Sequence, residues 1–339
     1  MEQTPNHMTD KVTNKMADNV AKKSNLGAFG DLITPVSEYV IRENFSVKPS
    51  LNPFRVVWPQ GHFVFNSVNK KSRIATVTDV KFIDEDTIVV AHRAAAKLFL
   101  MKLVDGGFVV VDKIKLRLWW RGDGRFFHPD LIAVDHNRIY MSEYTARILV
   151  VDVIDNKFRM LEHAYCGSTP FHGCYYANRR LMLGAVEGLQ VALLNDQLSL
   201  ERSLTVGAEE PDARIKTIGV ENEMFFLGLD KPQGAVSRSW FNAYQRIGDK
   251  LVLKDSLVFE DAQIDGHVFN GQYHFVAMEY GEWDAGCIAV IAFDGTSLEI
   301  KERFQCESFP HGLDVRGDTL IYSSYANSSI VKCRIAARN

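Results

Sequence analysis

The chain has 339 residues, a formal net charge of −3 and 46% hydrophobic residues, enough apolar content for one large domain or two ordinary ones. Its lysines and arginines form no long stripe, so a nucleic-acid partner is not expected. No apolar stretch reaches the roughly 20 residues that a membrane-spanning helix needs, so we expect no membrane span.

The N-terminal segment is polar and rich in lysine. It begins MEQTPNHMTDKVTNKMADN and, without an apolar core, lacks the pattern of a secretory signal. We expect residues 1–50 to form a largely flexible arm and residues 51–339 to form the folded domain. The cysteines number five, without CxxC spacing, which favours buried thiols in a cytoplasmic protein over a disulfide framework.

A strand, a tight polar turn and a second strand recur after about residue 54, in runs rich in valine, isoleucine, phenylalanine and tyrosine. The copies read DVKFIDEDTIVVAH, DLIAVDHNRIYMSEY, HGCYYANRRLMLGAV, KTIGVENEMFFLGLD, HVFNGQYHFVAMEY and HGLDVRGDTLIYSSY. Third and fourth strand-like runs follow most of them. Intervals of roughly 40 to 50 residues between copies are typical of β-propeller blades.

The last repeat leaves enough chain for only three strands of its blade. The segment FRVVWPQGHFVF, residues 54 to 65, precedes the first repeat and has no blade of its own. We therefore expect this segment to add the missing strand and close the ring. The sequence predicts an all-β protein, a six-bladed β-propeller with four-stranded blades, closed by an N-terminal strand.

The residues that open the repeats form a titratable set. The first strand of each blade lines the central channel of a propeller, so its first residue lies at one mouth of that channel. The six residues at this position are Asp79, Asp130, His172, Lys216, His267 and His311, where His267 needs a one-residue gap in the alignment. We expect the histidines and aspartates to be catalytic and Lys216 to bind substrate.

The second strand of each repeat ends at the same mouth and brings further polar groups there. A concave site with apolar walls and a few converging polar groups is the usual form of a ligand pocket. The additional candidate substrate-binding residues are His92, His128, Glu143, Tyr144, Glu279, Tyr280 and Tyr325, with Trp119 and Trp240 as walls.

Two kinds of chemistry fit such a mouth. Histidines from different blades can bind zinc or iron, although no local HxH or HxxxH pair supports this. Histidine beside carboxylates also gives an acid and a base, which suits dehydration, cyclisation or ring opening. Since GxSxG, P-loop and dinucleotide motifs are absent from the sequence, we expect metal-free acid/base chemistry without a cofactor.

The repeats, such as PHGLDVRGDTLIYSSYANSSI, resemble those of six-bladed gluconolactonase-like, NHL-type and strictosidine-synthase-like proteins over residues 54 to 335. Gluconolactonase-like members hold calcium in the channel with glutamate, asparagine and aspartate. The mouth of this chain is instead rich in histidine, which departs from that pattern. The resemblance implies a metal-dependent hydrolase or lyase as one alternative, with zinc, iron or calcium in the channel.

The length, the polar leader and the histidine- and aspartate-rich mouth are also similar to propeller proteins of fungal trichothecene clusters. This similarity implies a hydrophobic, hydroxylated sesquiterpenoid substrate and closure of an oxygen ring. An acid among His172, His267 and His311 would expel an allylic hydroxyl, and Asp79 or Asp130 would position or deprotonate the attacking hydroxyl. A non-catalytic binding platform is the remaining alternative, and the sequence leaves the oligomeric state open.

Overall fold

The computed structural model describes residues 32–41, 57–58, 61–62, 77–116 and 129–336. Short gaps within these ranges fall at 94, 106, 143–146, 166–169, 208–209, 234–235, 281–284, 307–308 and 326–327. The described chain consists of β-strands joined by turns and loops. It contains no helix long and apolar enough to cross a membrane.

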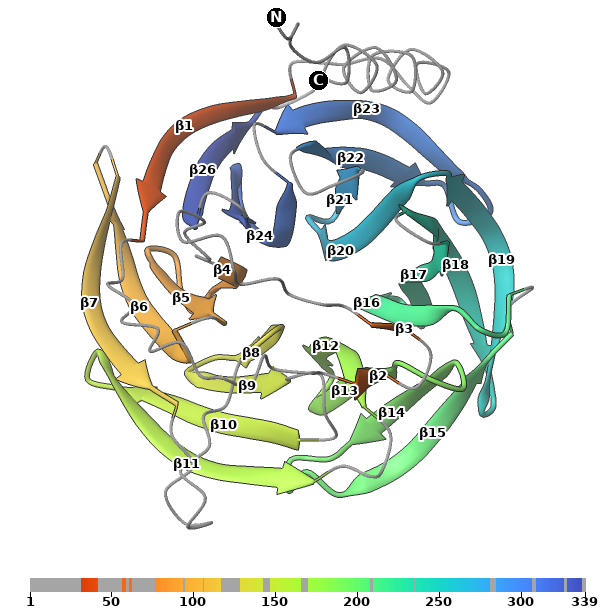
Figure 1. Ribbon diagram of the computed structural model, residues 1–339, viewed down its shortest axis with the longest axis horizontal. Coiled ribbons are helices and arrows are strands. Elements are labelled where there is room, and N and C mark those ends of the chain that lie inside the picture. The colour runs from red at the N-terminus through yellow and green to blue at the C-terminus, as the bar shows by residue number, and fades with distance from the viewer. Residues whose placement is uncertain are drawn as a thin grey trace, which may run out of the picture.

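Six blades of four strands surround a central axis (Figure 1). Blade 1 contains β4 (Val77–Phe82), β5 (Thr87–His92), β6 (Lys97–Val104) and β7 (Gly107–Lys115). Blade 2 contains β8 (Ile132–Asp135), β9 (Arg138–Ser142), β10 (Arg147–Ile154) and β11 (Lys157–Tyr165). Blade 3 contains β12 (Phe171–Ala177), β13 (Arg180–Ala185), β14 (Gln190–Leu194) and β15 (Leu200–Val206).

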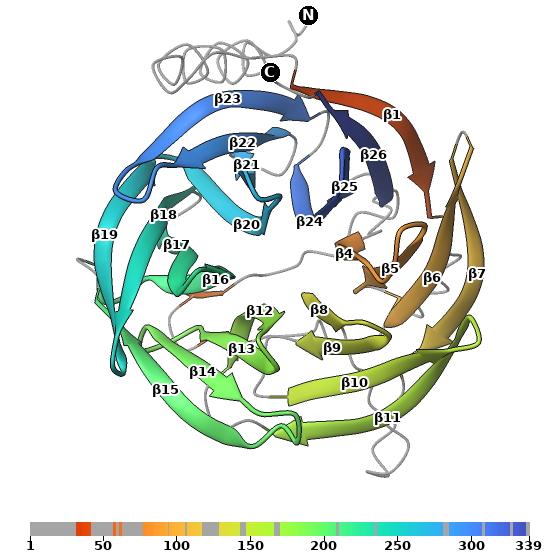
Figure 2. The ribbon, with the colours of Figure 1, turned by 180° about the vertical axis from the view of Figure 1, so that it is seen from behind.

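The other three blades follow the same order from the axis outward, as the reverse view in Figure 2 also shows. Blade 4 contains β16 (Arg214–Glu221), β17 (Met224–Gln233), β18 (Val236–Ile247) and β19 (Lys250–Phe259). Blade 5 contains β20 (Ala262–Phe269), β21 (His274–Tyr280), β22 (Ala285–Phe293) and β23 (Leu298–Cys306). Blade 6 contains β24 (Pro310–Arg316), β25 (Thr319–Ser324), β26 (Ser329–Ile335) and β1 (Ile33–Val40).

The polar turns of the repeats are tight hairpins. Asn178 and Arg179, between β12 and β13, have φ angles of 51° and 60°, and the turn residues Asn222 and Glu223 of blade 4 have φ angles of 46° and 67°. Two successive residues at positive φ form the turn whose twist matches paired antiparallel strands. In blades 3 and 4 this pair of turn residues therefore fixes the register of the inner two strands.

Apolar side chains fill the interfaces between neighbouring blades. Val89 of blade 1 and Met141 of blade 2 belong to one buried cluster, and equivalent clusters fill the other interfaces around the ring. Because each sheet buries both faces against its neighbours, the strands show apolar runs such as TIVVAH, which is buried at every residue. The core is thus a ring of six apolar layers.

An N-terminal strand closes the ring, as predicted, but it is not the segment expected. Strand β1 pairs with β26 in antiparallel register, with Ile33 opposite Ile335. The expected segment contributes β2 (Val57–Trp58) and β3 (Gly61–His62), which pair with each other. The closing strand therefore lies inside residues 1–50, which we had assigned to the arm. Burial explains the choice, since Leu32 and Ile33 pack in the apolar cluster between blades 5 and 6.

Carboxylates join neighbouring blades at their outer strands. Asp112 of blade 1 accepts a hydrogen bond from the backbone N–H of Phe158 at 2.8 Å, and Asp255 accepts one from Leu298 at 2.6 Å. Glu302 accepts the backbone N–H of Leu32 at 2.8 Å, immediately before the closing strand. Each contact satisfies a backbone donor that the next blade would otherwise leave without a strand partner.

Candidate functional site

A β-bulge lies at the start of the inner strands and sets which side chains face the axis. The register slips between Ile215 and Thr217 in blade 4 and between Ile264 and Gly266 in blade 5, and blades 1, 3 and 6 slip at the same level. A bulge re-aims the extra residue out of the ladder. In blade 2 the equivalent residue is Asp130, whose N–H donates to Ser142 O just before β8.

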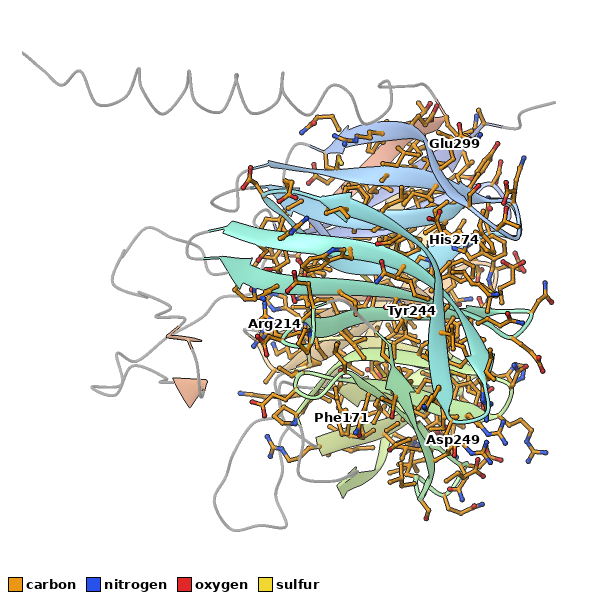
Figure 3. All side chains as sticks on the ribbon, turned by 90° about the vertical axis from the view of Figure 1, so that its right-hand side faces the viewer. Phe171, Arg214, Tyr244, Asp249, His274 and Glu299 are labelled. Carbon is orange, nitrogen blue, oxygen red and sulfur yellow. The ribbon has the colours of Figure 1, made fainter. Side chains whose placement is uncertain are left out.

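The six residues at this level form the axial ring, which lies near one face of the disc. Its members are Thr78, Asp130, His172, Lys216, Asp265 and His311. In the side view of Figure 3, Arg214 at the start of β16 lies toward that face, and Asp249 lies toward the opposite face.

Four members of this ring, Asp130, His172, Lys216 and His311, are residues that the sequence placed there. The expected members Asp79 and His267 instead lie one and two positions further along their strands, where the ring contains Thr78 and Asp265. The reason is the bulge, whose extra residue shifts any alignment made on the hairpin turns.

Sequence reasoning missed Asp265, although a signal for it exists. A glycine follows the ring residue in three blades, at Gly173, Gly266 and Gly312. A Cβ on Gly266 would lie 2.2 Å from His311 O, and one on Gly312 would lie 2.0 Å from Asp79 Oδ1. At Gly266 and Gly312 the inner strands approach so closely that only glycine fits. An alignment on His-Gly and Asp-Gly pairs would therefore have placed Asp265 in the ring.

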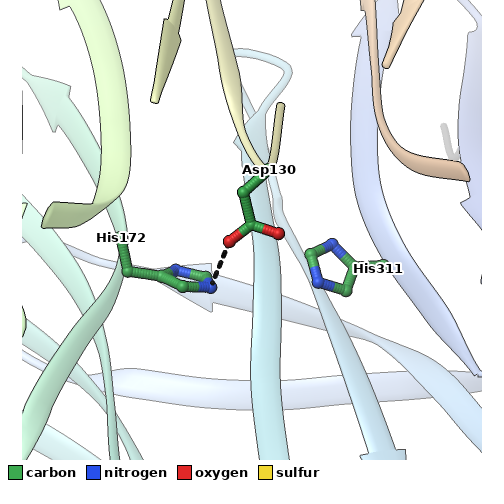
Figure 4. A group of neighbouring side chains, drawn as sticks. All are labelled: Asp130, His172 and His311. Carbon is green, nitrogen blue, oxygen red and sulfur yellow. Dashed lines mark ion pairs between the residues drawn. The ribbon is translucent and has the colours of Figure 1, made fainter. Parts of the chain in front are cut away.

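Asp130 and His172 are neighbours in the axial ring, and their side chains are in contact (Figure 4). Asp130 Oδ2 lies 3.2 Å from His172 Nε2, and Asp130 Oδ1 lies 3.2 Å from Arg93 Nη1. His172 Nδ1 lies 2.9 Å from the backbone oxygen of Lys216. Since a carbonyl oxygen only accepts hydrogen bonds, Nδ1 carries the proton of the neutral imidazole. His172 therefore presents the Nε2 lone pair to Asp130.

The other half of the ring is built on a buried ion pair. Lys216 Nζ lies 2.7 Å from Asp265 Oδ1, and their side chains are 2% and 0% exposed. His311 Nε2 lies 3.9 Å from the same carboxylate oxygen. The ring of Tyr325 stacks on His311 with 5.3 Å between centroids and 18° between planes, which holds the imidazole in place.

Burial and neighbouring charges set the protonation states of the residues in the axial ring. Burial and the charge of Lys216 lower the pKa of His172 to about 3. Burial opposes ionisation of Asp130, but Arg93 and the neighbouring cationic groups outweigh it and hold the pKa below its ordinary value. The charge of Lys216 similarly outweighs burial at Asp265 and lowers its pKa. The ring therefore combines a neutral His172 with two ionised carboxylates.

A cavity of about 210 Å³ occupies the channel between the ring and the opposite mouth. Its polar lining residues are Asp79, Lys81, Thr217, Asp265, His267, Asp314 and Arg316, and its walls include Phe82, Ile132, Tyr175, Ile218 and Val268. Among the described residues, this places the ligand-sized space on the far side of the ring from the mouth that the sequence indicated. Of the six ring members only Asp265 also lines the cavity, and of the other predicted site residues Asp79 and His267 line it.

Asp79 and Asp314 make similar contacts in blades 1 and 6, although they lie one and three residues after the ring position of their blades. Asp79 Oδ2 accepts the backbone N–H of Ile132 in blade 2 at 2.8 Å, and Asp314 Oδ2 accepts that of Phe82 in blade 1 at 2.8 Å. Lys81 Nζ donates to Asp79 Oδ1 at 2.9 Å. Burial raises the pKa of both carboxyl groups above the ordinary value, despite the opposing charge of Lys81.

His267 belongs to a buried histidine pair. Its Nε2 lies 3.0 Å from His274 Nδ1, and the rings of Phe226 and Phe241 pack against both imidazoles. Burial lowers the pKa of His267 well below its ordinary value and that of His274 to about 4. Both rings are therefore neutral near pH 7, and neither belongs to the axial ring.

The remaining predicted binding residues divide into three groups. Glu279, beside the ring, has its pKa raised by burial and by Asp265, and Tyr325 stacks on His311. His92 and Trp240 are buried away from the cavity, since His92 accepts the N–H of Ala95 and Trp240 packs in the cluster between blades 3 and 4. Lying outside the described residues are His128, Glu143, Tyr144, Trp119 and the side chain of Tyr280.

Comparison with known proteins shows the fold. No family and no curated protein matches the chain. The WD40 repeats of RRP9 superpose with a TM-score of 0.55 at 12% identity, over 89% of this chain and 99% of that one. The WD40 propeller domain of Doa1 gives 0.51 at 10% identity, over 90% and 97%. Kuenenia stuttgartiensis hydrazine synthase gives 0.52 at 11% identity, over 76% of each.

The chain folds as a β-propeller. At these identities the likeness concerns the arrangement of blades and says nothing about a shared activity. The four described cysteines, Cys174, Cys287, Cys306 and Cys333, are buried, and no disulfide joins them. Three ring residues, Asp130, His172 and His311, each place one potential metal ligand within 4.8 Å of the others.

Proposed function

We propose that the protein is an enzyme that acts on a small hydroxylated molecule in the channel cavity by acid/base chemistry. The observation that carries this proposal is one cavity lined by carboxyl groups in opposite electrostatic environments. Burial raises the pKa of Asp314, which favours its protonated form, and Lys216 holds Asp265 as a carboxylate at 2.7 Å. Such divergence within one site provides an acid and a base together.

The roles follow from these environments. Asp314 donates a proton to a hydroxyl group of the substrate, which leaves as water. Asp265 accepts the proton of the second hydroxyl group as its oxygen attacks the vacated carbon, and an oxygen ring closes. The lowered pKa values of His172 and His267 argue against the acid role that the sequence suggested for them, since neither is protonated near pH 7.

The apolar walls of the cavity favour a compact, largely apolar substrate. Phe82, Ile132, Ile218 and Val268 surround the polar floor, and apolar walls with a few polar groups suit a terpenoid polyol. The similarity to propeller proteins of fungal trichothecene clusters favours a sesquiterpenoid and closure of its oxygen ring. A cationic intermediate would be shielded from water in this channel.

The test is a screen with a blocked cavity as its control. Purified protein is incubated with hydroxylated and epoxidised sesquiterpenoids, and products are sought by mass spectrometry. We expect a product that is either one water lighter or an isomer of the substrate. Val268→Trp, in the cavity wall, should abolish turnover, whereas Val252→Trp, at a site 41% exposed, should not. Equal turnover by both variants would place the chemistry elsewhere, and binding without turnover would make the protein a binding platform.

A metal-dependent hydrolase or lyase is a second candidate, favoured by the convergence of Asp130, His172 and His311. The chemistry of that cluster can be examined without knowing a substrate.

A further inference from the structure

We propose that Asp130, His172 and His311 bind one divalent transition-metal ion at the axial ring. The inference concerns the ring and does not depend on the proposed activity in the cavity. All three residues are buried, with exposed fractions of 1%, 1% and 6%. They come from three different blades, so the closed propeller itself brings them together (Figure 4).

The spacing of the ligand atoms fits a metal ion. Asp130 Oδ2 and His172 Nε2 are 3.2 Å apart, and one atom from each of the three residues lies within 4.8 Å of the others. Zinc bonds of about 2.0–2.1 Å at tetrahedral angles place two ligand atoms about 3.3 Å apart. Asp130 and His172 therefore already hold the separation that a shared ion requires.

The hydrogen bonding of His172 orients it as a metal ligand. Its Nδ1–H donates to the backbone oxygen of Lys216 at 2.9 Å, so the lone pair of Nε2 faces the carboxylate oxygen of Asp130. Metal-binding histidines characteristically donate their second ring N–H to a carbonyl or carboxylate, which fixes the tautomer and the ring plane. A lone pair facing an anionic oxygen is unfavourable unless a proton or a cation lies between them.

Asp130 and His311 provide the other two ligand atoms of the proposed site. Asp130 Oδ2 and His311 Nδ1 have no hydrogen-bond partner among the described residues, although buried polar atoms are normally satisfied. Arg93 contacts the other carboxylate oxygen of Asp130 at 3.2 Å and so orients Oδ2 toward the histidines. Lys216, the cation within the axial ring, is engaged by Asp265 at 2.7 Å.

The ligand types indicate which ions fit. Two imidazole nitrogens and one carboxylate oxygen suit zinc or iron(II), whereas calcium and magnesium prefer sets of oxygen ligands. The calcium alternative raised by the sequence resemblance is therefore the least suited to this cluster. Three protein ligands also leave coordination positions open for water or a small ligand.

The experiment measures metal binding directly. Full-length protein without a histidine tag is stripped with a chelator and titrated with Zn²⁺ or Co²⁺, or with Fe²⁺ under anaerobic conditions. Bound metal is counted by elemental mass spectrometry, and the visible absorption of Co²⁺ reports the ligand set. We expect one ion per chain, a metal-dependent rise in Tm and a Co²⁺ spectrum of mixed nitrogen and oxygen ligands.

Variants decide whether the axial ring is the site. His311→Gln and Asp130→Asn should each weaken metal binding by more than about 100-fold. Losing a partner that only orients a ligand costs up to about 100-fold in metal affinity, and losing the ligand itself should cost more. The matched control His274→Asn removes a buried histidine of the pair described above and should bind like the unmodified chain. Using two ring variants keeps the test valid if one fails to fold. No stoichiometric metal in the unmodified chain, or unchanged affinity in a folded ring variant, would overturn the proposal.

Discussion

Asp130 Oδ2 and His172 Nε2 face each other at 3.2 Å across the boundary between blades 2 and 3. Neither residue lies in regular strand pairing, because both stand where the inner strand departs from its ladder. The backbone irregularity repeated around the axis thus concentrates charge at one level of the channel. Several consequences of this arrangement can be measured without knowing the substrate.

The ion pair between Lys216 and Asp265 should dominate the stability of the ring. Lys216→Met leaves a buried carboxylate without its partner and should reduce the free energy of unfolding by about 3–5 kcal/mol. The double variant Lys216→Met with Asp265→Leu should recover most of this loss. Lys301→Met, which breaks the more exposed pair with Glu299, serves as the control and should cost less than about 1 kcal/mol. Denaturant unfolding that ranks both lysine variants equally would refute this assignment.

Ring closure by β1 should be visible in a pair of substitutions on that strand. Ile33 is 3% exposed and Val36 is 50% exposed. Ile33→Ala should destabilise the propeller by about 2–4 kcal/mol because it empties space in the core between blades 5 and 6. Val36→Ala should change the stability by less than about 0.5 kcal/mol. If thermal unfolding does not separate the two, β1 does not hold the ring closed.

The buried histidine pair should make stability depend on pH. Burial lowers the pKa of folded His274 to about 4, whereas the unfolded chain takes up the proton near its ordinary value of about 6.5. The contribution is therefore complete above about pH 6.5 and is lost as the pH falls toward 4, by up to about 3 kcal/mol. His274→Asn should lose this component. Parallel stability profiles for the two proteins between pH 7 and 4 would contradict the expectation.

The close approach of the inner strands gives a prediction for glycine. A Cβ at Gly312 would lie 2.0 Å from Asp79 Oδ1, whereas one at Gly107 meets nothing within 4 Å. Gly312→Ala should therefore displace Asp79 and lower the Tm, by roughly 2 °C for each kcal/mol lost in a domain of this size. Gly107→Ala should leave the Tm nearly unchanged. Similar melting curves would show that the strands can separate at little cost.

The repeat in the sequence was sufficient to predict the propeller and its closure by an N-terminal strand. It was not sufficient to choose between LITPVSEYVI and FRVVWPQGHFVF, because both have strand-like apolar content and both precede the first blade. The choice depends on how Leu32 and Ile33 fill the last apolar layer, which no local pattern encodes.

The candidate site was predicted in part for a related reason. Turn-based alignment identified Asp130, His172, Lys216 and His311, but the bulges displaced it by one residue at Asp79 and by two at His267. The protonation states of the site could not be predicted from the repeat, since the neutrality of His172 follows from burial and from the charge of Lys216. The position of the cavity depends on side-chain volumes along all six inner strands.

The most direct test of the central claim is the pH dependence of turnover in the Asp314→Asn variant. Asp314 lines the cavity, and Asp318, on the exposed turn that follows, provides the control Asp318→Asn. With a substrate found by the screen, removal of the acid should slow kcat by about 100-fold or more. It should also remove the fall in rate as the pH rises through the pKa of that group. An Asp314→Asn enzyme with the rate and pH profile of the Asp318→Asn control would contradict acid/base catalysis in the channel.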